Sequence, residues 1–375
     1  MTLPRPPQSD ISLFLCGDVM TGRGIDQILP HAGEPQLFEP FMRSALGYVK
    51  LAEDRYGPLP RPVDFSYIWG DALPALARAA PDVRIVNLET AVTASGEAWP
   101  EKGIHYRMHP ANLPCLAAAR IDCCVLANNH VLDWGYRGLA ETLMSLRHAG
   151  IATAGAGMTL AEAAAPAILD VPGKGRVVVF AWALEDSGVP SEWGATEHRP
   201  GVNLLPDISP RSADAVANLV RKARQENDVV VASIHWGGNW GFEISERQRR
   251  FAQRLIESGA VDVVHGHSSH HAKGIEIHHD KPIIYGCGDF LNDYEGISGH
   301  EAYRGDLALM YFPTFHQGRL KRFEMTAMRI RYFQTGFAQG SEIQWLADTL
   351  NREGRKLGTR VIMESTHNLL LQWET

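Results

Sequence analysis

The stretch Ile11-Ser12-Leu13-Phe14-Leu15-Cys16-Gly17-Asp18 decides the fold class of this chain. It begins with an almost continuous apolar run, which is typical of a strand buried on both faces. The run stops abruptly at the glycine, and a carboxylate follows at once. The pattern predicts a buried strand with Asp18 directly beyond its carboxyl end.

Further runs repeat this pattern along the chain. They span residues 84–88, 123–127, 228–234, 260–264 and 282–286. Helical patterns lie between them, at 138–149, 212–225 and 246–258. Because strands alternate with helices, the sequence predicts an α/β fold. Ligands of such folds bind beyond the carboxyl ends of the strands, which is where the polar residues of this chain fall.

The size and composition fit a globular protein. The chain has 375 residues, of which 45% are hydrophobic and 21% are charged. This length suits one large domain or two ordinary ones. The Pro-rich, aromatic segment 34–67 is expected to be an ordered insertion near the mouth of the site. Residues 307–312 and 319–331 are expected to form added strands, and 341–354 a closing helix.

Charge and cysteine content exclude several classes of protein. The formal net charge is −7, so the basic excess of a nucleic-acid-binding protein is missing. No apolar stretch is long enough to span a bilayer, and residues 1–7 lack the apolar core of a targeting signal. The five cysteines form no C-x-x-C pair. We therefore expect a reduced, cytoplasmic protein with no nucleic-acid or membrane partner.

Residues with metal-ligating side chains follow several of the apolar runs. They are Asp18, Glu89, Asn129, His235, His267 and His270. Carboxylate, amide oxygen and imidazole together suit Mn, Fe, Zn or a similar divalent ion, and the absence of cysteine argues against a structural zinc. Either carboxylate could bridge two ions about 3.5–4 Å apart. An isolated Asp or His in such a position is more often a helix cap or a core residue, but the shared position favours a metal site.

The motifs around these residues resemble the CapA family. They are Gly17-Asp18-Val19-Met20-x-x-Arg23, Asn87-Leu88-Glu89, Asn128-Asn129-His130-x-x-Asp133-x-Gly135, His235-Trp236-Gly237 and Gly266-His267-x-x-His270. That family is named for capsule and poly-γ-glutamate synthesis proteins and is similar to calcineurin-like metallophosphatases. The resemblance implies a four-layer α/β/β/α metallophosphatase-like sandwich. It also implies a single domain over residues 1–375, with the insertion at 34–67 and a C-terminal extension at 296–375.

The resemblance also implies roles for individual residues. Asp18, Glu89 and Asn129 match metal ligands of the metallophosphatases, with Glu89 as the bridging carboxylate. The other ligand positions match His235, His267 and His270. His130 matches the histidine that acts on the reacting group, and Asp133 would orient its imidazole. One or two divalent ions are therefore expected.

This sequence departs from the family pattern at several positions. Met20 stands where metallophosphatases commonly have a histidine ligand, which leaves the number of ions open. Ser268 and Ser269 replace the usual His-Pro, His271 is an extra histidine, and Asp289 stands where Asn is usual. These departures leave the exact substrate open.

Arg23 and Trp236 are candidates for binding substrate. The planar guanidinium of Arg23 could clamp a carboxylate or phosphate, or it could form an ordinary surface salt bridge. Trp236, together with Trp240 and Phe242, could form a wall of the pocket or simply pack within its loop.

Two classes of function remain open from the sequence. The first is a metal-dependent enzyme acting on a peptide or poly-γ-glutamate-like chain, with the metal as Lewis acid and His130 moving the proton. Its reaction would be hydrolysis of an amide or phosphoester, or epimerisation of a residue next to a carboxylate, as in similar proteins from lasso-peptide pathways. The second is a non-catalytic, metal-dependent binder of an anionic polymer in capsule synthesis. The oligomeric state is left open.

Overall fold

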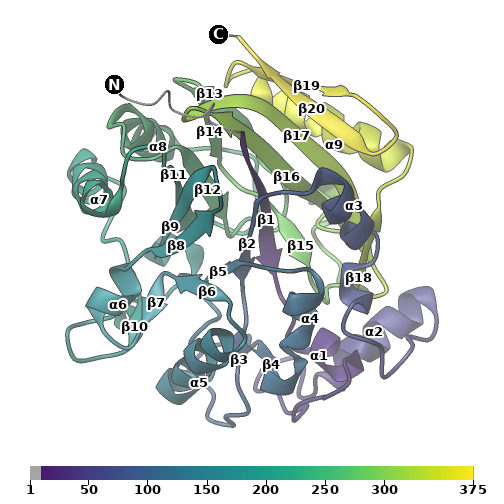
Figure 1. The fold of residues 1–375 in the computed structure, drawn as a ribbon. Coiled ribbons are helices and arrows are strands. Elements are labelled where there is room, and N and C mark those ends of the chain that lie inside the picture. The colour runs from purple at the N-terminus through teal and green to yellow at the C-terminus, as the bar shows by residue number, and fades with distance from the viewer. Residues whose placement is uncertain (1–9, 375) are drawn as a thin grey trace, which may run out of the picture.

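The computed structural model describes residues 10–374 and shows a mixed α/β fold (Figure 1). The start of the chain, where no targeting signal is expected, lies outside the described residues. The larger sheet has the strand order β19-β20-β17-β16-β1-β2-β5-β6, with β15 attached to β1 and β18 to β17. Its strands are β1 Ile11–Val19, β2 Val83–Leu88, β5 Cys123–Val125, β6 Ala152–Ala154, β15 Asp289–Leu291, β16 Leu307–His316, β17 Arg319–Arg331, β18 Gln334–Phe337, β19 Thr359–Met363 and β20 Asn368–Trp373.

The second sheet has the strand order β13-β14-β12-β11-β9-β8. Its strands are β8 Ala167–Val171, β9 Gly175–Ala183, β11 Val229–His235, β12 Val263–His267, β13 Ile275–His278 and β14 Lys281–Ile284. Two small pairs complete the strands, namely β3 Ala91–Val92 with β4 Arg107–Met108, and β7 Ala156–Gly157 with β10 Gly201–Val202. The core strands of both sheets run parallel, as the continuous apolar runs predict.

The helices lie mostly at the outside of the sheets (Figure 1). They are α1 Gly24–Ile28, α2 Leu46–Tyr56, α3 Ala72–Ala79, α4 Pro114–Ala118, α5 Gly135–His148, α6 Leu160–Ala164, α7 Pro210–Ala223, α8 Glu246–Glu257 and α9 Ser341–Gly354. The starts of α7 and α8 follow from local sequence, because the hydroxyls of Ser209 and Ser245 accept a hydrogen bond from a backbone N–H of the first turn. None of the helices in residues 10–374 is both long and apolar enough to cross a membrane.

Side chains of β9 alternate between two buried clusters. Val178, Phe180 and Trp182 pack with α7 and α8, whereas Val177 and Val179 belong to the cluster that contains the residues of β1. Each strand residue buried in this way stabilises the fold by roughly 1.5–3 kcal/mol. The smaller sheet therefore has helices on one face and the main core on the other.

The expected elements are found close to their predicted positions. All six apolar runs form strands, and the three predicted helices are α5, α7 and α8. Strand boundaries differ at several places: β1 runs to Val19 and so contains Asp18, which was expected beyond its end, and β12 covers Val263–His267 rather than 260–264. The strand β12 therefore carries His265 and His267 within the strand itself. The added strands and closing helix are β16, β17 and α9, and the first two join the sheet that contains β1.

The carboxyl ends of the central strands meet at one place. Asp18 of β1 lies in register with Asn87 of β2 and with Asp289 of β15. His235 of β11 lies in register with His267 of β12. The two sheets thus bring carboxylates from one side and imidazoles from the other to a common edge.

Candidate metal centre

A first group of donors comes from the ends of three strands. Asp18, His235 and His267 each offer one ligand atom, and these atoms lie within 4.8 Å of one another. All three side chains are fully buried. Asn129 adds an amide oxygen, since its Oδ1 lies 3.1 Å from Nε2 of His235. Together they present one carboxylate, one amide oxygen and two imidazoles.

A second group shares Asp18 with the first. The ligand atoms of Asp18, His270 and Asp289 also lie within 4.8 Å of one another, and Nδ1 of His270 is 2.8 Å from Oδ1 of Asp289. In the sequence, Asp289 stood out only as a departure from the family pattern. The signal that could have marked it is the one that marked Asp18, a carboxylate shortly after a buried apolar run.

Glu89 lies between the donor groups and His130. Its Oε1 is 4.0 Å from Nε2 of His235 and 3.7 Å from Nε2 of His130. Asn87 holds both neighbouring carboxylates, donating from Nδ2 to Asp18 Oδ1 at 2.8 Å and to Glu89 Oε2 at 3.3 Å. The six predicted ligand positions therefore lie together in one place.

The donor set fits a divalent cation. Oδ2 of Asp18 is buried without a hydrogen-bond partner among the described residues. Burial and the neighbouring Asp289 raise the pKa of Asp18 to about 7, and burial with the neighbouring Asp18 raises the pKa of Glu89 well above its ordinary value. Carboxylates gathered in a buried site are costly unless a positive charge balances them. Oxygen and imidazole donors together suit Mn, Fe or Zn.

The two histidines of the first group are neutral, as metal-binding imidazoles are. Burial, reinforced by neighbouring histidines, lowers the pKa of His235 and of His267 well below the ordinary value. Nε2 of His267 is 2.8 Å from Oγ of Ser233, and its Nδ1 lies 2.8 Å from Nδ1 of His235 and 4.0 Å from Oδ1 of Asp18. The Nδ1 atoms of the two rings thus face each other beside Asp18, and a neutral imidazole is the form that binds metals.

His130 lies beside the candidate metal ligands, and Asp133 holds the opposite side of its ring. Nδ1 of His130 is 2.7 Å from Oδ2 of Asp133, and the same oxygen accepts a hydrogen bond from the backbone N–H of Tyr106 at 2.6 Å. Burial lowers the pKa of His130 to about 4, although Asp133 opposes the shift. The ring is therefore neutral at pH 7, with Nε2 directed at Glu89.

Lys102 completes this arrangement and was missed in the sequence. Its Nζ lies 3.0 Å from Nδ1 of His130 and donates to Oδ1 of Asp133. The side chain is only 14% exposed. Lys102 belongs to the long segment between β3 and β4, where no periodic pattern or motif points to it.

Arg23 is engaged entirely within the protein. The side chain is buried and bonds Asp293 through Nε at 3.2 Å and Glu39 through a terminal nitrogen at 3.1 Å. Its guanidinium lies over the rings of Tyr48 and Tyr106, 3.8 and 4.2 Å from their centroids. It thus ties the segment 34–67 to the loop after β15.

Trp236 packs in the core, and Trp240 lies nearer to the donors. Nε1 of Trp236 donates to the carbonyl of Tyr285 at 3.0 Å, and the two rings are stacked. The ring of Trp240 lies 5.3 Å from that of His270. Of the two tryptophans, Trp240 is the one that contacts a donor side chain.

Comparison with known proteins identifies the family. The family model described as bacterial capsule synthesis protein PGA_cap matches residues 12–294. This chain belongs to the PGA_cap family. The match includes every donor described above, Asp289 included. The expected resemblance to CapA proteins is confirmed.

The names of two relatives of this chain refer to polymer synthesis. The chain is 47% identical over 355 residues to a probable polyglutamine synthesis accessory protein of Mycobacterium tuberculosis, covering 94% of this chain and 93% of the relative. It is 25% identical over 298 residues to the PGA biosynthesis protein CapA of Bacillus subtilis, covering 76% of this chain and 63% of that protein.

Proposed function

We propose that this PGA_cap protein is a divalent-metal-dependent hydrolase that cleaves an amide bond in a poly-γ-glutamate-like chain or a related peptide. The polymer is taken from the names of the relatives, which refer to polyglutamine and PGA synthesis. The fold that we propose for it is the four-layer metallophosphatase-like sandwich, formed as one domain with an insertion at 34–67 and a C-terminal extension at 296–375. The expected cytoplasmic location stays a prediction.

The observation that carries this proposal is the position of His130 beside the donors. One nitrogen of its ring is held by Asp133 and Lys102, and the other faces Glu89 at 3.7 Å. A neutral, oriented imidazole at the edge of a metal site is suited to moving a proton to or from a reacting group. One open nitrogen is enough for hydrolysis, whereas exchange of an α-proton takes a base on each face.

The residues divide into those that would hold metal and those that act on the substrate. Asp18, Asn129, His235 and His267 would hold one ion, and Asp18, His270 and Asp289 a second, with Glu89 at the boundary. A bound ion supplies Lewis-acid chemistry to an oxygen of the substrate.

Other residues prepare the site for proton transfer. Asp133 and Lys102 fix the ring of His130, whose Nε2 would first take a proton from the attacking water and then pass it to the leaving amine. Asn87 keeps the carboxylates of Asp18 and Glu89 in place by donating to both.

A second candidate is a non-catalytic, metal-dependent binder of an anionic polymer. The word accessory in the name of the mycobacterial relative favours it. In that case the same donors would hold metal, but nothing would depend on a mobile proton at His130.

The test combines turnover with metal content. The protein is loaded with Mn, Fe or Zn and incubated with poly-γ-glutamate, and new amines are measured, with phosphate release from a phosphoester as a parallel assay. His130→Ala should abolish turnover and keep its metal, whereas Glu89→Ala and His235→Ala should lose metal. If His130→Ala loses the metal, its assigned role is wrong.

Other outcomes select among the alternatives. Incorporation of solvent deuterium into a peptide without cleavage would show epimerisation in place of hydrolysis. Tight, metal-dependent binding of the polymer without any turnover would support the non-catalytic binder.

A further inference from the structure

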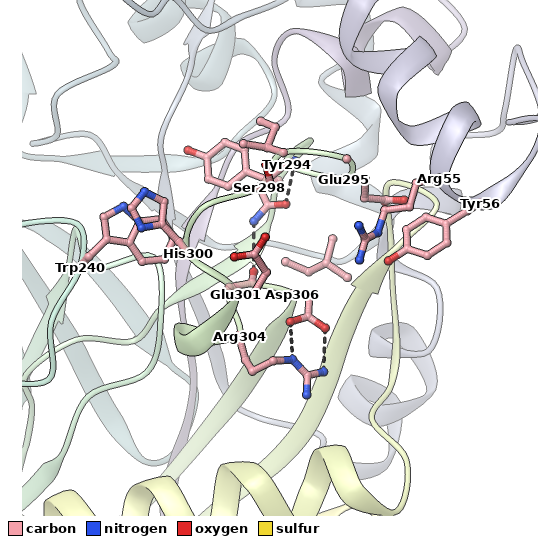
Figure 2. Close-up of a pocket in the computed structure, with 15 residues that line it drawn as sticks. Arg55, Tyr56, Trp240, Tyr294, Glu295, Ser298, His300, Glu301, Arg304 and Asp306 are labelled. Atoms are coloured by element: carbon pink, nitrogen blue, oxygen red, sulfur yellow. Dashed lines mark hydrogen bonds and ion pairs between the residues drawn. The ribbon is translucent and has the colours of Figure 1, made fainter.

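Tyr294 stands between the second donor group and a cavity (Figure 2). The cavity has a volume of about 360 Å³ and lies between the end of α2, the loop from β15 to β16, and Trp240. Tyr294 lines it, and its ring also lies 5.3 Å from the ring of His270. The residue is partly exposed, and Figure 2 shows its hydroxyl on the far side of the ring from Arg55. A molecule that enters from the cavity towards the donors would therefore meet Tyr294.

The hydroxyl of Tyr294 lacks a strong acceptor within residues 10–374. It donates to Sδ of Met20 at 3.6 Å, and a thioether sulfur accepts hydrogen bonds only weakly. The hydroxyl of Tyr106 lies beside it and has no well-aligned partner of its own in the described part of the chain. Because Tyr294 can accept from Tyr106, its own proton is the one that is left for a better acceptor.

The contact with Met20 places this hydroxyl on the side of the donors. Met20 follows Asp18 by two residues and is fully buried, and its backbone N–H donates to the carbonyl of Leu291 at 2.9 Å. Burial, reinforced by the neighbouring Asp289, raises the pKa of Tyr294 well above its ordinary value. The phenol therefore keeps its proton at neutral pH and is a hydrogen-bond donor at the edge of the second donor group.

The loop that carries Tyr294 is held firmly in place. Asp293, the residue before it, accepts hydrogen bonds from Nε of Arg23 at 3.2 Å and from the backbone N–H of Gly24 at 2.9 Å. The guanidinium of Arg23 also lies 5.8 Å from the centroid of the Tyr294 ring. The backbone N–H of Tyr294 donates to Oδ1 of Asn292 at 3.1 Å. A donor fixed in this way needs little rearrangement to stabilise a charge that develops in front of it.

We propose that the hydroxyl of Tyr294 is a catalytic hydrogen-bond donor to the carbonyl oxygen of the amide that is cleaved beside His270 and Asp289. This inference rests on the proposed function, since water that adds to the carbonyl carbon moves the C=O electrons onto that oxygen. The hydroxyl would bind the resulting oxyanion more strongly than the uncharged carbonyl, and so it would stabilise the transition state. Because the donor is uncharged, the contact does not need a free cation in the cavity.

The first experiment measures binding and does not depend on turnover. The probe is inorganic phosphate, a tetrahedral oxyanion, which is titrated by calorimetry into the full chain loaded with Mn²⁺. In Tyr294→Phe the ring stays and only the hydroxyl is lost. Because a hydrogen bond to a charged oxygen is then missing, binding should weaken by about tenfold. Metal content, measured by elemental analysis, should be unchanged.

Tyr67→Phe is the matched control. Tyr67 belongs to the short 3₁₀ helix Tyr67–Trp69, and its hydroxyl donates to the carbonyl of Tyr332 at 3.0 Å. The variant should bind phosphate as the unaltered protein does. The inference is overturned if the unaltered protein does not bind phosphate or if the two variants bind it equally. It is also overturned if Tyr294→Phe loses its metal, since Tyr294 would then support the metal ligands instead of the substrate.

Turnover separates failure of this inference from failure of the proposed function. In hydrolysis of poly-γ-glutamate, Tyr294→Phe should lower kcat by about 10²–10³-fold and leave KM nearly unchanged, because the hydrogen bond is strongest in the transition state. Phosphate binding that depends on Tyr294, without any cleavage of the polymer, would support the donor role and count against the hydrolase. Cleavage with equal kcat in Tyr294→Phe and Tyr67→Phe would support the hydrolase and overturn the inference.

Discussion

At the scale of single residues, Asp18 is the side chain on which the site depends most. It belongs to both donor groups and is flanked by Asn87 and Asp289 through strand register. The rule that revealed it in the sequence, a carboxylate directly after a buried strand, needs only local information. Lys102 could not be found in that way, because it reaches His130 from a segment without any pattern.

The first prediction concerns the pH dependence of stability in metal-free protein. Burial and Asp289 raise the pKa of Asp18 from 3.8 to about 7. A carboxyl whose pKa is raised on folding binds more protons in the folded state between these values, so its contribution to the free energy of unfolding falls as pH rises through this window. In Asp18→Asn this pH-dependent decrease in the free energy of unfolding, on the order of a few kcal/mol, should be absent.

The measurement is urea unfolding of chelator-treated protein at pH 5 and pH 8. Comparison with Asp18→Asn separates the effect of Asp18 on the pH dependence of stability from the effect of the neighbouring histidines. The stability advantage of the variant should be larger at the higher pH. An advantage that does not grow with pH would mean that Asp18 is ionised at both.

The second prediction concerns Lys102. In Lys102→Met the ring of His130 loses a neighbour at Nδ1 and Asp133 loses its ion pair. Because an oriented acid–base group contributes about 10²–10⁴-fold to a rate, we expect turnover to fall by at least about tenfold with metal content unchanged. Lys222→Met, at an exposed position on α7, serves as control. Equal activity of the two variants would make Lys102 dispensable.

At the scale of elements, the close parallel pairing of β1 with β15 shapes the site. A Cβ on Gly17 would lie 1.6 Å from the carbonyl oxygen of Gly288. Only a glycine lets the two strands come this close, and this approach sets Asp289 beside Asp18. The sequence contained the glycine, but its partner strand lies more than two hundred residues away and could not be inferred.

The third prediction follows from that close pairing. Gly17→Ala should push β15 away from β1, separate Asp289 from Asp18, and lower both metal content and stability. Gly103→Ala is the control, since a Cβ there meets nothing within 4 Å. Metal content by elemental analysis and thermal unfolding are the measurements. A Gly17→Ala protein that keeps its full metal content would show that the donors do not depend on this approach.

At the scale of the whole molecule, local patterns predict elements but not their neighbours. The strands and helices of the central α/β part followed from apolar runs and caps. The order of the sheets did not, because pairing of distant strands leaves no mark on local sequence. The C-terminal strands are an example, since β16 and β17 were expected as added strands, yet β16 lies directly against β1.

The fourth prediction tests the importance of that pairing. A chain ending at residue 306 lacks β16 and leaves an apolar edge of β1 unpaired, so it should aggregate. A chain ending at residue 358 lacks only the outer strands β19 and β20 and should be affected less. Soluble yield and size-exclusion chromatography measure the difference. Equal soluble yields would mean that β1 does not need β16.

The pairing of β1 with β16 also has a consequence for synthesis in the cell. Ile11 pairs with Phe315, and ribosomes add about 5–20 residues per second. After its synthesis, β1 therefore waits roughly 15–60 s for one of its neighbours. During that time the nascent chain exposes an unpaired, apolar strand edge. Chaperones shield surfaces of this kind until translation is nearly complete.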